Sequence, residues 1–414
     1  MISRNNHRFA WLERNSVKYS GLTILLLSVL FSPLYAQLSD WNFGGYAKEL
    51  VTYDDGTLDD FPFETGQWQN TLQLRLNGFW YPTDDLSVSI QARNLLTYQE
   101  NMNLYREFQN LFATNSYYFD LKWEWLEDDD IYGFSEIDRF YLDWIKDDWE
   151  VILGRQRIAW GTCLVWNPTD LFNPFDILDF DYEERPGTDA VHVQYYTGSL
   201  SQFNLAVTPG RTKYEVIYAG RYTTNKWNYD FGLIAGWQRN SPRLAANWSG
   251  EIWDGGFRGE LLYTDPNITY TMINFESLTW ETVEVTDPYL TFSLSYDYTF
   301  QNSFYLHTEY LYNGLGTTDN AGSRRFDIIY TGELSPGRNS IYQEFAYQLT
   351  PLLRADFFVI YNPNDKSWIA APSLQYSVAT NWETYLLIFP TGGDNGTEYG
   401  GFPTQYFARV KFSF

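Results

Sequence analysis

Apolar and polar residues alternate one by one over many short segments of the chain. Between residues 71 and 81, Leu72, Leu74 and Leu76 fall on one side, and polar residues stand between them. The segment from 290 to 297 repeats the pattern. Side chains on a β-strand point to opposite faces with a period of two residues. The pattern therefore predicts strands that have one apolar and one polar face.

Short polar turns and long loops connect these predicted strands in alternation. Asp84 and Asp85 form one of the short turns, and Gln301 and Asn302 form another. Short turns at one end and long loops at the other are typical of an up-and-down barrel in a membrane. The long connections are residues 54–67, 99–135, 161–188, 266–288, 314–338 and 391–401.

The aromatic content supports a membrane barrel. The chain is 20% aromatic, and rings collect at both interfaces of such a barrel. Beyond residue 36 it has no run of 18 apolar residues, which excludes membrane-spanning helices. We therefore predict an all-β fold, a transmembrane antiparallel up-and-down β-barrel of about 18 strands. Residues 214–254 are difficult to divide into strands, so a barrel of about 16 is the alternative, and either size leaves an aqueous channel.

The N-terminal segment has the three parts of an export signal. Arg4, Arg8 and Arg14 precede an apolar stretch over residues 22–34, and the small residue Ala36 follows. The apolar stretch is too short to span a membrane comfortably. We therefore expect residues 1–36 to be a secretory signal that is cleaved on export, and residues 37–414 to form the barrel. A retained anchor helix is the alternative.

Charge and cysteine content exclude several classes of protein. With 52 acidic and 28 basic residues the net charge is −24, so nucleic-acid binding is not expected, because it depends on clustered Lys and Arg. Cys163 is the single cysteine, and there are three histidines. We therefore expect no disulfide, no bound metal and no cofactor. Acidic runs such as Glu127 to Asp130 lack the spacing of a calcium loop, and solvated charge is the simpler interpretation.

The last predicted strand carries the most specific signal. Its apolar face ends on a terminal aromatic residue, and it resembles the C-terminal signal by which outer-membrane barrels are recognised for assembly. The chain thus resembles Gram-negative porins and porin-like proteins. The resemblance implies export by the Sec pathway, an outer-membrane location, and contact with lipid, lipopolysaccharide and the barrel-assembly machinery. A homo-oligomer or a periplasmic partner stays open. The residues of this face are Tyr406, Ala408, Val410, Phe412 and Phe414.

Residues Gly154 to Gly161, followed by Trp166 to Pro174, resemble a segment of uncharacterised outer-membrane proteins, and this resemblance transfers no activity.

Charged residues on the predicted polar faces form two groups of opposite sign. Two such walls would set a transverse field across a narrow pore, orient dipolar solutes and penalise apolar ones. The alternative is that these charges pair with each other and keep the channel wet. The basic group is Arg75, Arg93, Arg139, Arg155, Arg157, Arg409 and Lys411, and the acidic group is Asp297, Glu309, Glu344, Asp356 and Glu383.

The connection 161–188 is the candidate constriction. A loop of this length usually has a function or is disordered, and its two Asn-Pro pairs favour defined turns. We expect it to fold into the pore and to set carboxylates opposite the arginines, with packing over the rim as the alternative. Aromatic guidance of sugars by Trp160, Trp166, Phe172 and Phe175 is a weaker hypothesis. The constriction candidates are Trp166, Asp170, Phe172, Asp176, Asp179 and Glu183.

These features predict a channel for passive diffusion of small hydrophilic solutes or ions, without catalysis. The first rival is a barrel that serves as a sheath or scaffold for a periplasmic or surface partner, such as an electron-transfer cytochrome. The second is an outer-membrane enzyme, which would need His192 or His307, since His7 lies in the predicted signal. No Gly-x-Ser-x-Gly motif accompanies them.

Overall fold

A computed structural model describes residues 40–56, 66–100, 102, 106, 117–173, 181, 183–274 and 279–414. The predicted export signal, residues 1–36, lies outside the described residues. Among the described residues, no helix is long and apolar enough to cross a membrane.

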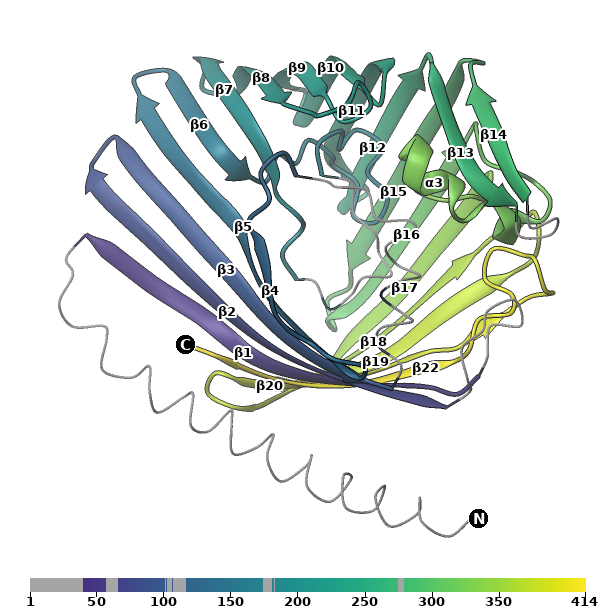
Figure 1. Cartoon of the computed structure of the whole chain (residues 1–414). Coiled ribbons are helices and arrows are strands. Elements are labelled where there is room, and N and C mark those ends of the chain that lie inside the picture. Colours follow the sequence, from purple (N-terminus) through teal and green to yellow (C-terminus); the bar gives the residue numbers. More distant parts are fainter. Residues whose placement is uncertain are drawn as a thin grey trace, which may run out of the picture.

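Eighteen antiparallel strands form a closed barrel (Figure 1). The barrel closes where the first strand pairs with the last one, from Tyr46 opposite Ser413 to Asp54 opposite Gln405. The predicted barrel of eighteen strands is therefore confirmed, and residues 214–254 hold three separate strands. The barrel strands are β1 (Trp41–Asp54), β2 (Gln67–Thr83), β3 (Leu86–Gln99), β5 (Ile131–Lys146), β6 (Trp149–Gln156), β7 (Thr188–Gly198), β8 (Ser201–Thr208), β9 (Ile217–Lys226), β10 (Tyr229–Gln238), β11 (Ser241–Ile252), β12 (Gly255–Thr264), β15 (Tyr289–Thr299), β16 (Phe304–Asn313), β17 (Asn339–Thr350), β18 (Leu353–Tyr361), β19 (Trp368–Ala379), β20 (Trp382–Phe389) and β22 (Gln405–Ser413).

The remaining elements belong to the connections. Strand β4 (Lys122–Glu127) pairs with the outer half of β5, beside the point where the shorter β6 stops. Strands β13 (Ile268–Asn274) and β14 (Thr279–Val285) form a separate hairpin. This hairpin stands beside α3 (Asp327–Thr331), which follows the short helix η2 (Ala321–Arg324) (Figure 1). Strand β21 (Thr391–Gly392) pairs with the start of β19.

The long connections gather at one end of the barrel, because each follows an odd-numbered position in the order of barrel strands. The opposite end has tight turns, as at Trp227-Asn228 and Trp253-Asp254, where both residues have positive φ. Turns of this geometry match the right-handed twist of the flanking strands. In outer-membrane barrels the short turns face the periplasm, which orients this barrel.

The outward face of the strands is apolar. Leu205, Leu233 and Leu244 are more than half exposed on the outside, whereas their chain neighbours Asn204, Ile234 and Arg243 are buried. A belt of exposed leucine and aromatic side chains around a closed sheet with no free edge suits lipid surroundings. The fold is therefore that of a transmembrane β-barrel.

Candidate functional site

The described residues of the connection between β6 and β7 lie inside the barrel; we call this connection, residues 157–187, the lumen loop. It is described at residues 157–173, 181 and 183–187. The loop first folds on itself. The carboxylate of Asp170 accepts hydrogen bonds from the backbone N–H groups of Trp160 and Gly161, the latter at 2.8 Å, and the side chain of Asn173 accepts one from Ile158 at 2.8 Å.

Two carboxylates of the wall hold the backbone of the lumen loop. Glu260 on β12 accepts N–H hydrogen bonds from Cys163 at 2.8 Å and from Thr169 at 2.9 Å, besides one from Thr162. Glu309 on β16 accepts N–H hydrogen bonds from the next three residues, Leu164, Val165 and Trp166, at 3.1, 3.2 and 2.6 Å. Both glutamates are fully buried. Because buried N–H groups need acceptors, these two side chains fix the path of the loop.

Apolar contacts fix the same loop from both sides. Ile158, Trp160, Leu171 and Phe172 pack against apolar side chains on the inner faces of β7 to β12, four of which are alanines, including Ala206 and Ala219. Those two alanines face each other across β8 and β9, and their small side chains let the loop lie close to the wall.

Farther along the loop, Val165 and Trp166 pack against Leu311 and Tyr342 of β16 and β17. Trp160, Trp166 and Phe172 are therefore buried in packing rather than presented to lumen water. Phe175 lies outside the described residues.

The second half of the lumen loop reaches a different part of the wall. Its acidic residues, Asp181, Glu183 and Glu184, form what we call the acidic segment. The inward basic side chains of β1, β2 and β22, namely Lys48, Arg75, Arg409 and Lys411, form what we call the basic wall.

The acidic segment and the basic wall are joined by ion pairs. Lys48 lies 2.8 Å from Asp181, Arg409 lies 3.2 Å from Glu183, and Arg75 lies 3.4 Å from Glu184. Lys411 also pairs with Glu183. The lumen loop thus contacts the wall on three sides, along β7–β12, along β16–β20 and at the basic wall, and it narrows the lumen at this level.

Three of the predicted arginines pair with carboxylates of other strands. Arg75 lies 2.8 Å from Asp138, Arg93 lies 2.6 Å from Glu136, and Arg155 lies 2.9 Å from Asp189. Of the remaining two, Arg139 donates to the backbone carbonyls of Asp138 and Arg185. Arg157 is exposed and begins the lumen loop, because β6 ends at Gln156.

The alternation of side chains does not reveal Asp138. One extra residue in β5 opposite Gln91 and Ala92 places both Asp138 and Arg139 inside the barrel. Such a bulge breaks the period of two. Glu260, Lys48 and Asp189 were also missed as lumen residues. Their places on the inward face could have been found only by fixing the register of each strand.

The side chains of the predicted acidic group lie inside the barrel, and each has a partner. Asp297 pairs with Arg258, and Asp356 lies 2.7 Å from Arg354. Glu344 lies 3.5 Å from His307, while Glu309 holds the loop backbone. Glu383 accepts a hydrogen bond from Arg409 at 2.9 Å. Positive and negative side chains are therefore interleaved on both sides of the lumen. Asp176 and Asp179 lie outside the described residues.

Two carboxyl groups of the lumen loop have opposite pKa shifts. Burial raises the pKa of Asp170, although its hydrogen bonds from Gly161 and Trp160 and the charge of Arg185 act the other way. Burial also disfavours ionised Glu183, but the hydrogen bond and charge of Lys411 and the charge of Arg409 outweigh it and lower the pKa of Glu183.

The raised pKa of Asp170 gives a testable pH dependence. The folded state binds the Asp170 proton more tightly than the unfolded state does, so this residue makes folding less favourable as pH rises above the ordinary aspartate value of 3.8. We expect Asp170→Asn to remove this part of the pH dependence. The measurement is the thermal unfolding midpoint of both proteins between pH 4 and pH 7; equal slopes of midpoint against pH would contradict the assignment.

Among the described residues, no group of three or more His, Cys, Asp and Glu side chains could hold a metal ion.

Comparison with known proteins finds similarity in fold but not in sequence. No protein-family model matches the chain, and no curated protein sequence matches it. OccAB3 of Acinetobacter baumannii superposes with a TM-score of 0.52 at 10% identity, over 91% of this chain and 100% of that chain.

Two structures from Pseudomonas aeruginosa are similar to the same degree. OpdK, solved with vanillate, has a TM-score of 0.53 at 11% identity, over 92% of this chain and 100% of that chain. OpdQ has a TM-score of 0.53 at 8% identity, over 91% and 99%. At these identities the likeness shows the fold alone. The chain therefore has the fold of porin-type outer-membrane barrels, and its solute must be argued from its own residues.

Proposed function

We propose that the protein is an outer-membrane channel through which small hydrophilic solutes or ions diffuse passively past a charged constriction. The observation that carries this proposal is the meeting of the acidic segment with the basic wall inside the barrel. The charges are paired, yet the side chains of Glu183, Glu184 and Glu383 keep 28%, 27% and 31% of their surface exposed. Water can therefore reach a strongly polar strip beside β1, β2, β20 and β22.

The chemistry of this strip favours hydrophilic solutes. A solute with hydrogen-bonding groups can replace the water that the charged side chains hold, whereas an apolar solute would strip that water without compensation. Alternating charges also orient a dipolar solute, and the field is stronger in a narrow, low-dielectric passage than in bulk water. Selection by polarity and size requires no energy source, which fits passive diffusion.

The sheath hypothesis loses support because this chain fills much of its own lumen. Besides the lumen loop, the connections after β16 and β20 pack together: Arg325 donates to the carbonyls of Thr397 and Gly400, and buried Glu398 accepts from Ser335 at 2.8 Å. Leu334 and Tyr399 of these connections pack in the same cluster as Trp166. A sheath needs this space for its partner.

Catalysis is also not supported, although one arrangement resembles a triad. The hydroxyl of Ser295 lies 2.9 Å from Nε2 of His307, whose Nδ1 lies 3.5 Å from Glu344. However, Ser295 and His307 are 0% and 1% exposed, and Glu309 lies 3.4 Å from the same Nε2. A substrate could not reach this serine. Nε2 of His192 lies 3.3 Å from the side-chain oxygen of Asn204, which is not a nucleophile.

The outward face of β22 fits the proposed assembly signal. Tyr406 is exposed and its ring lies 6.1 Å from that of Tyr53, and the ring of Phe412 lies 4.9 Å from that of Trp382. Phe414 exchanges backbone hydrogen bonds with Gly45. Recognition by the assembly machinery is part of this proposal, as are outer-membrane lipids as surroundings and assembly into oligomers.

Planar-bilayer recording tests the proposed function. The protein, purified from outer membranes after expression of the full chain, should give discrete conductance steps and a reversal potential in a salt gradient. A folded barrel that never conducts would contradict a channel function. Release of the N-terminal 36 residues on export can be checked in the same preparation by mass.

A further inference from the structure

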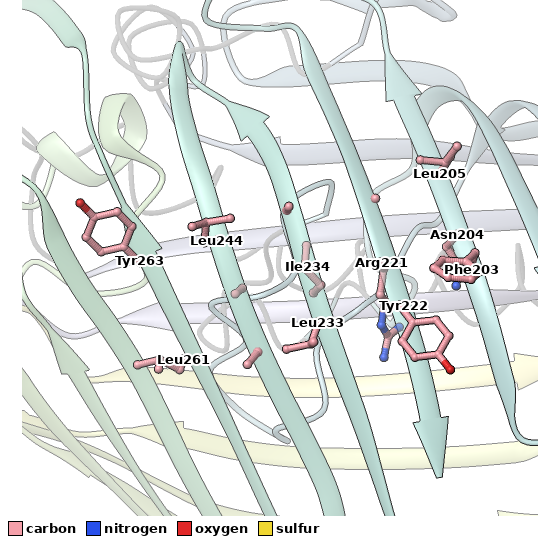
Figure 2. Close-up of a pocket in the computed structure, with 14 residues that line it drawn as sticks. Phe203, Asn204, Leu205, Arg221, Tyr222, Leu233, Ile234, Leu244, Leu261 and Tyr263 are labelled. Carbon is pink, nitrogen blue, oxygen red and sulfur yellow. The ribbon is translucent and has the colours of Figure 1, made fainter.

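The lipid-facing wall has a depression over five consecutive strands, β8 to β12. It has a volume of 780 Å³ and is lined almost entirely by apolar side chains. Figure 2 shows Leu205, Leu233, Leu244 and Leu261 on the near face of the sheet, with the guanidinium of Arg221 behind it. The depression is therefore on the outside of the barrel, and the one charged side chain beside it points into the lumen.

The strand register explains the shape of the depression. One row of outward side chains runs across the five strands as Leu205, Gly220, Ala235, Leu244 and Tyr263. The missing side chain of Gly220 and the methyl group of Ala235 leave a gap between the two leucines.

The neighbouring row has a gap in a different place. It runs as Phe203, Tyr222, Leu233, Ala246 and Leu261. Ala246 leaves its gap beside that of the first row, so the two gaps join into one hollow with leucine and aromatic sides.

The inner face at the same strands is packed against the lumen loop. Ala219, Ile234 and Ala245 are buried in one cluster with Trp160 and Phe172. The wall behind the hollow is therefore held from the inside. Because the gaps come from Gly220, Ala235 and Ala246 themselves, the hollow does not depend on the position of a mobile side chain.

The position of the hollow restricts its occupant. Gly220 and Leu233 lie near the middle of β9 and β10, at the depth where a barrel meets hydrocarbon. A second copy docked around a two-fold axis through the hollow would place hollow against hollow and leave a void, which close packing disfavours. A flexible hydrocarbon chain can fill it.

We propose that this hollow binds one acyl chain of a lipopolysaccharide molecule. Tyr263, at the upper side of the hollow, is the penultimate residue of β12, at the end where the long connections gather. That end faces the outer leaflet in the orientation given above. Its hydroxyl lies where the carbonyl of an acyl chain enters the hydrocarbon, as interfacial tyrosines do. The inference needs the outer-membrane location of the proposed function but not solute conduction.

Filling the hollow provides the test. In Gly220→Leu/Ala235→Leu, two leucines occupy the floor. Gly220 has ordinary negative φ, and a Cβ there would meet only the flexible side chain of Leu205, at 3.2 Å. A displaced acyl chain goes into other hydrocarbon and not into water, so what is lost is van der Waals packing. Loss of roughly ten carbon–carbon contacts between the wall and the bound chain corresponds to about a tenfold loss of retained lipid.

The full chain is purified from outer membranes, exchanged repeatedly into detergent, and examined by native mass spectrometry and fatty-acid analysis. We expect about one lipopolysaccharide per wild-type barrel and about tenfold less in the double variant. The matched control is Ala355→Leu, which adds the same side chain at an outward alanine between Tyr347 and Leu374 of the neighbouring strands and should retain the lipid.

Retention that is unchanged in the double variant, absent in wild type, or equally reduced in the control would overturn the proposal. Retained phospholipid in place of lipopolysaccharide, or a second copy of the chain, would overturn the assignment of the occupant. Should the double variant not fold, Ala246→Leu fills the other row alone.

Bilayer conductance of the same samples keeps the two proposals separate, because these side chains face away from the lumen and their change should leave conductance unaltered.

Discussion

Replacing Glu260 and Glu309 together with glutamine is expected to raise single-channel conductance severalfold. The two carboxylates accept six backbone hydrogen bonds from residues 162–166 and 169. Each glutamine keeps one oxygen but turns an NH₂ group toward the N–H groups that the other oxygen had served. A buried donor without its acceptor costs about 1–3 kcal/mol, so several such losses exceed what holds the lumen loop in place.

Planar-bilayer conductance of the double variant measures this effect. The matched control is Glu344→Gln, which removes a carboxylate near the same His307; in the described part of the chain, its hydrogen bond and ion pairs are with Tyr342, His307 and Arg354 of the wall. Wild-type conductance in the double variant, with an unaltered barrel by circular dichroism, would show that the loop does not limit the passage.

Reversing the charge of Arg409 is expected to shift ion selectivity strongly toward cations. Arg409 stands among Asp181, Glu183 and Glu383, at 3.5, 3.2 and 2.9 Å. Arg409→Glu removes one positive charge and adds a negative one beside three carboxylates. At about 5 Å and the dielectric of water, a unit charge changes an ion's energy by about 0.8 kcal/mol. A change of two charges therefore favours a cation by about 1.7 kcal/mol and disfavours an anion by the same amount, which raises the cation-to-anion ratio by more than about a hundredfold before screening by salt.

The measurement is the reversal potential in a salt gradient at low and high ionic strength. Screening should shrink the shift at high salt, and Arg409→Gln should produce about half of it. Adding Glu183→Arg to Arg409→Glu should move selectivity back. A reversal potential that does not respond to either change would place the ion path away from the basic wall.

The strands and their inward charges were predictable because both follow from a local period of two. Arg75, Arg93 and Glu344 point inward for the reason that the alternation implies, and the strand count follows from the same pattern. The features that could not be predicted are those that depend on the register between neighbouring strands. Asp138 is hidden by a bulge, since the period shifts by one residue there.

The partners of the lumen loop could not be predicted for a different reason. Thr162 and Glu260 are 98 residues apart, and Trp166 and Glu309 are 143 apart. No local pattern links a backbone N–H group to a carboxylate at such a distance. Length and Asn-Pro pairs favoured an ordered loop, but its position depends on which inward side chains the closed barrel brings to the same height. The interleaving of acids and bases on both sides, rather than two walls of single sign, arises from the same long-range pairing.

The anchoring of the lumen loop also couples closure of the barrel to the width of its bore. Glu260 and Glu309 belong to β12 and β16, so they meet the N–H groups of the loop only when those strands have joined the sheet. The basic wall needs both ends of the chain, because Lys48 belongs to β1 whereas Arg409 and Lys411 belong to the final strand. Joining β22 to β1 therefore seals the sheet and also brings these cations together around the acidic segment. Completion of the wall and narrowing of its bore are then a single step.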